Sequence, residues 1–188
     1  SVLIMEQTSG QFDQVIQACK DIFLKKNADY GTSWRILRTT TLTDQLFIKA
    51  QRIRGIETKG FHLINEGIEP EYIGIVNYSV MALIQMRLQP DEQTEIPVNR
   101  AEELFDSIVA EVKALMMQKN HDYGEAWREM RVQSFTDMIL VRLMRIRQIE
   151  DNAGQTLVSE GIDANYMDII NFAIFALIRL GETRKTEN

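Results

Sequence analysis

Two pairs of basic side chains, each spaced three residues apart, are the groups of this chain best suited to hold an anion. Lys49 and Arg52 form the first pair, and Arg142 and Arg145 form the second. Residues three apart on a helix share a face, and the isoleucines around the first pair indicate a closely packed helix. Basic groups in such a place suit bound phosphates or buried carboxylates, and surface salt bridges are the alternative.

Carboxylates are the second set of side chains with chemical potential. Magnesium prefers oxygen ligands, often one or two carboxylates together with substrate phosphates. Asp168 and Asn171 lie three residues apart, so both can aim at one point from a helix face. The candidate acids are Asp29, Glu57, Glu66, Asp122, Glu150, Glu160 and Asp168.

The elements that would position these residues are written twice in the chain. Residues 12–57 align without a gap onto 105–150, and residues 66–86 align onto 160–180, with 27 identities in the 67 pairs. Each copy is too long for a solenoid repeat, whose period is about 20–50 residues. We therefore expect two homologous domains, packed as a pseudo-two-fold helical bundle because like units usually pair with that symmetry.

Three main helices are expected in each copy, because the few glycines and prolines fall between stretches of helical apolar periodicity. The first pair should cover about 11–27 and 100–120 and end at the Asp-Tyr-Gly turns. The second should begin at Thr43 and Thr136 as N-caps. The third should begin near Pro70 and near residue 164, as a nearly all-apolar helix at the centre of the bundle. We expect repeat 1 over 1–88, a linker over 89–99, repeat 2 over 100–181 and a flexible tail over 182–188.

Comparison of the copies separates kept residues from drifted ones. Core positions keep only their apolar character, and we interpret Thr32/Glu125 and Ile36/Glu129 as surface positions that drifted. Cys19 faces Val112 in the alignment, so it reads as a core residue. The kept polar and aromatic residues are candidates for binding: Lys26, Asp29, Tyr30, Trp34, Arg52 and Asn77, with Lys119, Asp122, Tyr123, Trp127, Arg145 and Asn171, while Lys49 is matched by Arg142.

Asn77 and Asn171 stand in the middle of the most apolar helices. A buried amide is unfavourable unless it is hydrogen-bonded, so these residues serve either a structural network or a ligand. Asp168 has no acidic counterpart, because Gly74 takes its place in the first copy. We expect the second copy to carry the metal-binding acid.

Composition narrows the classes of protein. The net charge of −6 argues against a protein that coats nucleic acid. No apolar run reaches the length of about 18 residues that a membrane span needs, and no signal peptide is visible. The sequence has one cysteine. It contains no phosphate-binding loop and no Cys/His spacing typical of a metal site. We expect a cytoplasmic protein that binds neither nucleic acid nor membranes directly and that can form a homo-oligomer.

The repeated series Lys-Asn-x-Asp-Tyr-Gly-x-x-Trp, Thr-Asp, Arg-Ile-Arg-x-Ile-Glu, Glu-Gly-Ile and Tyr-x-x-Ile-x-Asn resembles a bacterial and phage family of tandem all-helical domains associated with nucleotide modification. That family is similar in fold to the MazG-like all-α nucleoside triphosphate pyrophosphatases. The resemblance implies a magnesium-dependent site that cleaves a nucleoside triphosphate to monophosphate and pyrophosphate. The superfamily signature, Glu-x-x-Glu on one helix and Glu-x-x-Asp on a later one, is incomplete here, since Arg54 and Arg147 replace acids.

Three hypotheses follow. In the first, the protein is a pyrophosphohydrolase with magnesium as cofactor, in which Glu57, Glu66, Glu150, Glu160 and Asp168 are the metal-ligand candidates, and Glu150 and Asp168 are catalytic. In the second, it binds nucleotides without turnover. In the third, it is a helical scaffold, whose kept polar residues point apart onto the surface instead of converging in a cleft.

Overall fold

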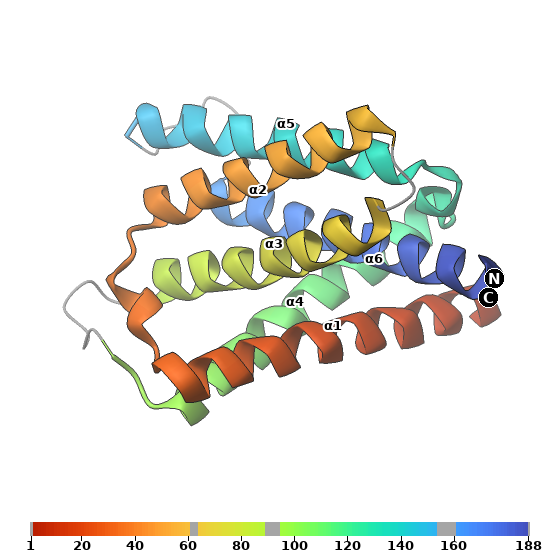
Figure 1. Cartoon of the computed structure of the whole chain (residues 1–188). Helices are drawn as coiled ribbons and strands as arrows, with labels where there is room; N and C mark the ends of the chain where they lie inside the picture. The colour runs from red at the N-terminus through yellow and green to blue at the C-terminus, as the bar shows by residue number, and fades with distance from the viewer. Residues whose placement is uncertain (1, 61–63, 89–94, 154–160, 188) are drawn as a thin grey trace.

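The chain folds into paired helices stacked in three tiers. The computed structural model describes residues 2–60, 64–88, 95–153 and 161–187, and these form six α-helices and two 3-10 turns without a strand. Repeat 1 contains α1 (Val2–Tyr30), α2 (Thr39–Lys59) and α3 (Ile64–Arg87), and repeat 2 contains α4 (Val98–Tyr123), α5 (Val132–Asp151) and α6 (Ile162–Glu187). Figure 1 shows α1 beside α4, α3 beside α6 and α2 beside α5. The predicted all-α fold of two tandem repeats is confirmed.

Reciprocal contacts relate the repeats by a pseudo-two-fold axis. Lys20 pairs with Asp106 at 2.9 Å, and the equivalent Lys113 pairs with Asp13 at 2.8 Å. The same exchange occurs between α2 and α5, in the ion pairs Arg54–Asp137 (3.5 Å) and Arg147–Asp44 (3.2 Å). When residue i contacts j and the equivalent of j contacts the equivalent of i, the interface is isologous.

The core lies between the tiers, and α3 and α6 are its centre. Both helices carry nearly continuous apolar runs, and Tyr72 and Tyr166 are completely buried. A helix buried on most of its circumference must be apolar on most of its circumference. The span Ile162–Thr186 is therefore long and apolar enough to cross a membrane by length and composition, but 72% of its most apolar window is buried inside the bundle, as in a core helix.

The first and second helices of each repeat are joined by a turn that a glycine begins. Gly31 and Gly124 adopt φ of 66° and 63°, which suits glycine because it has no Cβ to clash. The 3-10 turns Ser33–Ile36 and Ala126–Glu129 follow. Gln85 on α3 donates to the carbonyl oxygens of Arg35 (2.9 Å) and Leu37 (2.6 Å). The predicted helix stop at Asp-Tyr-Gly is confirmed.

Several predicted helix boundaries were wrong. α1 begins at Val2 instead of residue 11, and α4 begins at Val98, inside the predicted linker. α2 begins at Thr39, so Thr43 is not an N-cap but a buried residue one turn inside the helix, and Thr136 is equally interior to α5. α3 begins at Ile64, which places Pro70 inside the helix. In α1 the added turns make tertiary contacts, such as the hydrogen bond from Thr8 to Glu125.

Two further expectations differ from the structure. The tail predicted to be flexible continues α6 to Glu187, and Arg184 within it forms an ion pair with Glu69 of α3. Thr32 and Glu125 are not surface positions, since 1% and 8% of their surfaces are exposed. Glu125 accepts hydrogen bonds from Thr8 (2.7 Å) and Trp127 (2.6 Å). Cys19 is buried as predicted, and burial raises the pKa of its thiol to about 12.

Candidate functional site

A cavity of about 530 Å³ lies in repeat 1, between α1, α2 and α3. Three of the candidate binding residues, Lys26, Lys49 and Asn77, line it from these three helices. Its apolar wall includes Ile73, and Tyr78 and Met81 form one side. A mostly apolar cavity with a few convergent polar groups is the usual form of a small-molecule site.

A second hollow of about 300 Å³ continues the first toward the Asp-Tyr-Gly turn. The two share Lys26, Tyr78 and Met81, so they form one groove along repeat 1. Tyr30 and Trp34 line the second hollow. The groove therefore offers cationic groups in one part and aromatic surfaces in the other.

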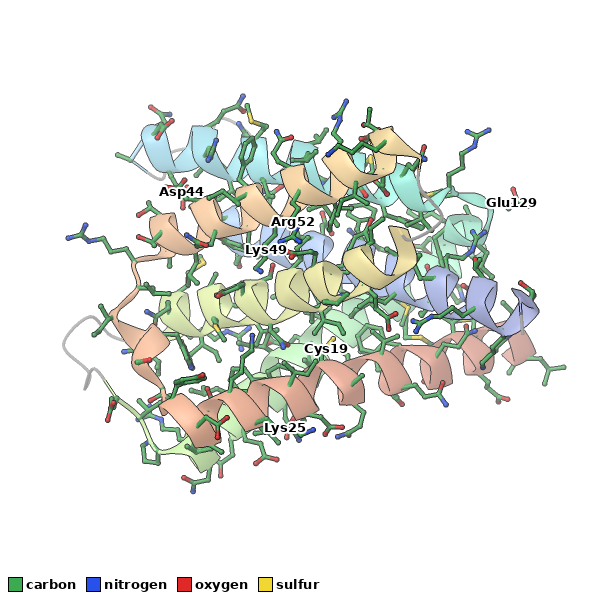
Figure 2. All side chains as sticks on the ribbon, viewed as in Figure 1. Cys19, Lys25, Asp44, Lys49, Arg52 and Glu129 are labelled. Atoms are coloured by element: carbon green, nitrogen blue, oxygen red, sulfur yellow. The ribbon has the colours of Figure 1, made fainter. Side chains whose placement is uncertain are left out.

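Lys49 on α2 pairs with an acid on α3 that the sequence comparison did not single out. Its Nζ lies 3.4 Å from Glu71, and Arg52 approaches the other carboxylate oxygen of Glu71 at 3.4 Å. Figure 2 shows Lys49 and Arg52 side by side on α2, facing α3. The Lys49 ammonium also lies 5.2 Å from the centre of the Tyr78 ring, which it meets by a cation–π contact. Arg52 is 65% exposed and does not line the cavity.

Asn77 has a structural hydrogen bond, and its position at the cavity leaves the predicted ligand contact open. Its Nδ2 donates to the carbonyl of Cys19 at 3.0 Å, which ties α3 to α1. Its Oδ1 is buried and has no hydrogen-bond partner among the described residues, although the residue lines the cavity. Asn171 makes the equivalent bond to Val112 at 3.4 Å, and its Oδ1 is likewise unpaired. An unpaired buried acceptor favours a ligand that brings a donor.

In repeat 2, a carboxylate of the chain itself pairs with the two cations equivalent to Lys26 and Lys49. Asp168 accepts a hydrogen bond from Lys119 at 2.7 Å and lies 3.4 Å from Arg142, and 12% of its side chain is exposed. Asn171, one turn along α6, contacts Val112 instead. The expected pair of Asp168 and Asn171 therefore does not converge on one point.

The remaining kept residues are spread over the molecule. Tyr30 and Tyr123 are each 75% exposed, and Asp29 and Asp122 beside them lie on the surface. Trp127 is a core residue stacked on Phe175 at 4.2 Å. Arg145 is half-buried on α5. The side chain of Glu66 and the whole of Glu160 lie outside the described residues.

Glu57 and Glu150 belong to two equivalent networks between the repeats. Thr136 donates to Glu57 at 3.1 Å and meets the Tyr72 hydroxyl at 2.5 Å. Thr43 repeats this with Glu150 at 2.9 Å and the Tyr166 hydroxyl at 2.5 Å. Burial raises the pKa of Glu57 to about 7 and raises the pKa of Glu150, while the threonine hydrogen bonds oppose the rise. These acids join the repeats and do not line the cavity of repeat 1.

Comparison with known proteins matches both halves of this arrangement. A family model described as nucleotide modification associated domain 1 matches residues 26–86 and again residues 119–180. The chain belongs to this family. No curated protein matches the chain, and no solved structure matches it. Each copy of the nucleotide modification associated domain includes the Asp-Tyr-Gly turn and the second and third helices, which carry most of the groove.

Among the described residues, the acids of this domain pair do not fit a magnesium ion held by the protein alone. Within the described residues, no group of three or more acidic, histidine or cysteine side chains is placed to share a metal. Asp168 is neutralised by Lys119 and Arg142, and Glu57 and Glu150 accept hydrogen bonds from threonines of the opposite repeat. Magnesium needs several free oxygens at one point.

Two contributors to the site, Glu71 and Arg184, were missed in the sequence, although the exchange of Asp168 for Gly74 was noticed. Glu71 corresponds to Asn165, and Gly74 corresponds to Asp168, so the acid has moved by one helical turn between the repeats. A column-by-column comparison of α3 with α6 would have found this exchange. Arg184 lines the cavity from the end of α6, and no repeat signal marks it, because its counterpart falls in the region between the repeats.

Proposed function

We propose that repeat 1 binds a nucleotide in the groove formed by its two adjoining cavities. Membership of the nucleotide modification associated family supports a nucleotide as the chemical class of the ligand. The groove supplies the two kinds of contact that a nucleotide needs, which are cations for phosphate and aromatic surface for the base.

The phosphates would lie at Lys26 and Lys49. Both lysines line the larger cavity, and lysine binds phosphate as a compact point charge with three donors. Lys26 makes no hydrogen bond or ion pair with another described residue, so its charge is available to a ligand. The overall charge of −6 would disfavour a bare anion at long range, and the local cations offset this.

The base would lie between Tyr78 and the wall that contains Tyr30 and Trp34. These aromatic residues line the smaller cavity, and Tyr78 belongs to both. Stacking on an aromatic ring tolerates different bases, at about 1–3 kcal/mol per base. Trp34 donates its Nε1 to Asn27 at 3.1 Å, which fixes the ring in the wall.

The observation that carries the proposal is the buried, unpaired Oδ1 of Asn77, a residue that lines this cavity. Asn77 is 6% exposed, and leaving a buried acceptor unpaired costs about 1–3 kcal/mol. A ligand with an N–H or O–H group would satisfy it. A nucleotide has such donors on its sugar and its base.

The test compares Asn77→Ala with Asn171→Ala in calorimetric titrations of nucleoside mono-, di- and triphosphates. Both variants lose the same kind of bond to a backbone carbonyl, so the second controls for stability. We expect Asn77→Ala to weaken binding by about tenfold or more and Asn171→Ala to leave it unchanged. Equal effects of the two variants, or no binding of any nucleotide to the native chain, would contradict the proposal.

The same titrations with magnesium, followed by an assay for released pyrophosphate, separate binding from hydrolysis. Binding without pyrophosphate release is expected, because Asp168, Glu150 and Glu57 are already engaged by cations and hydroxyl groups. Release of pyrophosphate that is lost in Asp168→Ala or Glu150→Ala would instead support the pyrophosphohydrolase hypothesis.

A further inference from the structure

One position is filled differently in the two repeats and shows what the groove cations can hold. In repeat 2 the Asp168 carboxylate lies between Lys119 (2.7 Å) and Arg142 (3.4 Å). The equivalent residues of repeat 1 are Lys26, Lys49 and Gly74, and all three line the cavity. Repeat 1 thus keeps both cations and the space, but has no carboxylate of its own there.

Gly74 has no side chain, and the Lys49 side chain lies over it. A Cβ added at Gly74 would lie 3.1 Å from both Cε and Nζ of Lys49. The lysine therefore crosses directly over the glycine, where an aspartate would stand in the other repeat. Glu71, one turn earlier on α3, partly neutralises the charge of Lys49. Lys26 has no such partner among the described residues.

We propose that the notch above Gly74 is an anion subsite that takes a phosphoryl group between Lys26 and Lys49, in the place that repeat 2 fills with the Asp168 carboxylate. Repeat 2 is then a self-occupied copy of the site, and the chain binds one ligand instead of two. The identity of the ligand as a nucleotide rests on the proposed function, whereas the subsite itself requires only a phosphoryl anion.

The subsite also constrains the ligand that enters it. Asn77 follows Gly74 by three residues, so it lies on the same face of α3, about 4.5 Å farther along the helix axis. A ligand seated in the notch should therefore carry a hydrogen-bond donor close to its phosphoryl group. A phosphorylated sugar with a free hydroxyl meets this requirement, and inorganic pyrophosphate meets only the anionic part.

Transplanting the aspartate tests the subsite directly. Inorganic pyrophosphate is titrated calorimetrically into the native chain, Gly74→Asp and Gly74→Ala. The alanine adds the same Cβ without charge, and it displaces only the flexible end of Lys49. We expect one site in the native chain, affinity lowered at least about tenfold in Gly74→Asp, and a smaller loss in Gly74→Ala.

The reverse exchange supplies the second arm. Asp168→Gly in a Gly74→Asp background should move the single pyrophosphate site to repeat 2. Amide chemical shifts of the native chain locate the ligand without any variant, with Gly74 and Asn77 expected to shift and Asp168 to remain unchanged. Equal affinity in Gly74→Asp and the native chain, or shifts confined to repeat 2, would overturn the subsite.

The nucleotide titrations distinguish this failure from that of the proposed function. Pyrophosphate binding that Gly74→Asp abolishes, without binding of any nucleotide, would support the subsite and refute the nucleotide assignment. Nucleotide binding that Asn77→Ala weakens and Gly74→Asp leaves intact would support the nucleotide assignment and refute the subsite.

Discussion

Single residues decide which repeat has an open site. Gly74 and Asp168 occupy equivalent places, and one leaves a cavity while the other neutralises two cations. The sequence comparison noticed the lost acid and expected chemistry in repeat 2. That expectation rested on the Asp168 carboxylate and did not include its partners Lys119 and Arg142. Ion pairs between helices depend on packing, which a local sequence pattern does not predict. The cavity lined by Gly74 instead places the candidate site in repeat 1.

Glu57 gives a pH-dependent prediction at the same scale. Burial raises its pKa from 4.5 to about 7, so between these values the folded chain holds a proton that the unfolded chain releases. The stability of the native chain should therefore fall as pH rises from about 4.5 to 7. Glu57→Gln lacks this titration, so its advantage in melting temperature over the native chain should grow across this window and then level off.

The expected gain is about 1 kcal/mol after allowance for the partial exposure of the carboxylate, or about 2–4 °C in melting temperature. Thermal unfolding at pH 5, 6, 7 and 8 measures it, with Glu103→Gln on the exposed face of α4 as the control. A Glu57→Gln advantage that is constant with pH, or that shrinks as pH rises, would show that the Glu57 carboxylate titrates normally.

At the scale of elements, the sequence predicted which helices exist better than where they begin. Apolar periodicity and the Asp-Tyr-Gly turns gave three helices in each repeat. Thr43 and Pro70 carried local start signals, yet both lie inside helices. Thr43 is kept because its hydroxyl bonds Glu150 and Tyr166 of the other repeat. A residue kept for a tertiary contact can look like a cap when only its neighbours in sequence are considered.

The end of α6 carries a prediction about the groove. Arg184 lines the cavity of repeat 1 and pairs with Glu69 in its wall. Arg184→Ala should weaken nucleotide binding by roughly three- to tenfold, because it removes a cation and leaves Glu69 to repel the phosphates. The adjacent exposed Lys185→Ala is the matched control in the same titration. Identical affinities of the two variants would show that the end of α6 takes no part in the site.

At the scale of the whole molecule, the duplication predicted the architecture, and the contacts show how the copies depend on each other. Thr136 of repeat 2 joins two residues of repeat 1, because it meets the Tyr72 hydroxyl and donates to Glu57. Lys20 and Lys113 exchange equivalent partners across α1 and α4. The sequence could predict such pairing from symmetry. It could not show that the repeats differ in their sites, because the exchange of Gly74 on α3 for Asp168 on α6 acts through contacts with the neighbouring helices.

This mutual dependence predicts a single cooperative unfolding transition. Each repeat buries part of its core and its tyrosine hydroxyl against the other, so neither should persist alone. Scanning calorimetry should give a calorimetric enthalpy equal to the van't Hoff enthalpy. Thr136→Val, which leaves Tyr72 and Glu57 without their shared partner, should lower the stability by about 1–3 kcal/mol while keeping one transition. Two resolved transitions would mean that the repeats are independent domains.

The most direct measurement of the central claim is a calorimetric titration of a nucleoside triphosphate into the native chain, Lys26→Ala and Lys25→Ala. Lys25 is the exposed neighbour of Lys26 and lies on the outer side of α1 (Figure 2), away from the groove. Binding in repeat 1 alone predicts one ligand per chain, affinity at least about tenfold weaker in Lys26→Ala, and native affinity in Lys25→Ala. Two equivalent ligands per chain, or the same affinity in all three proteins, would contradict it.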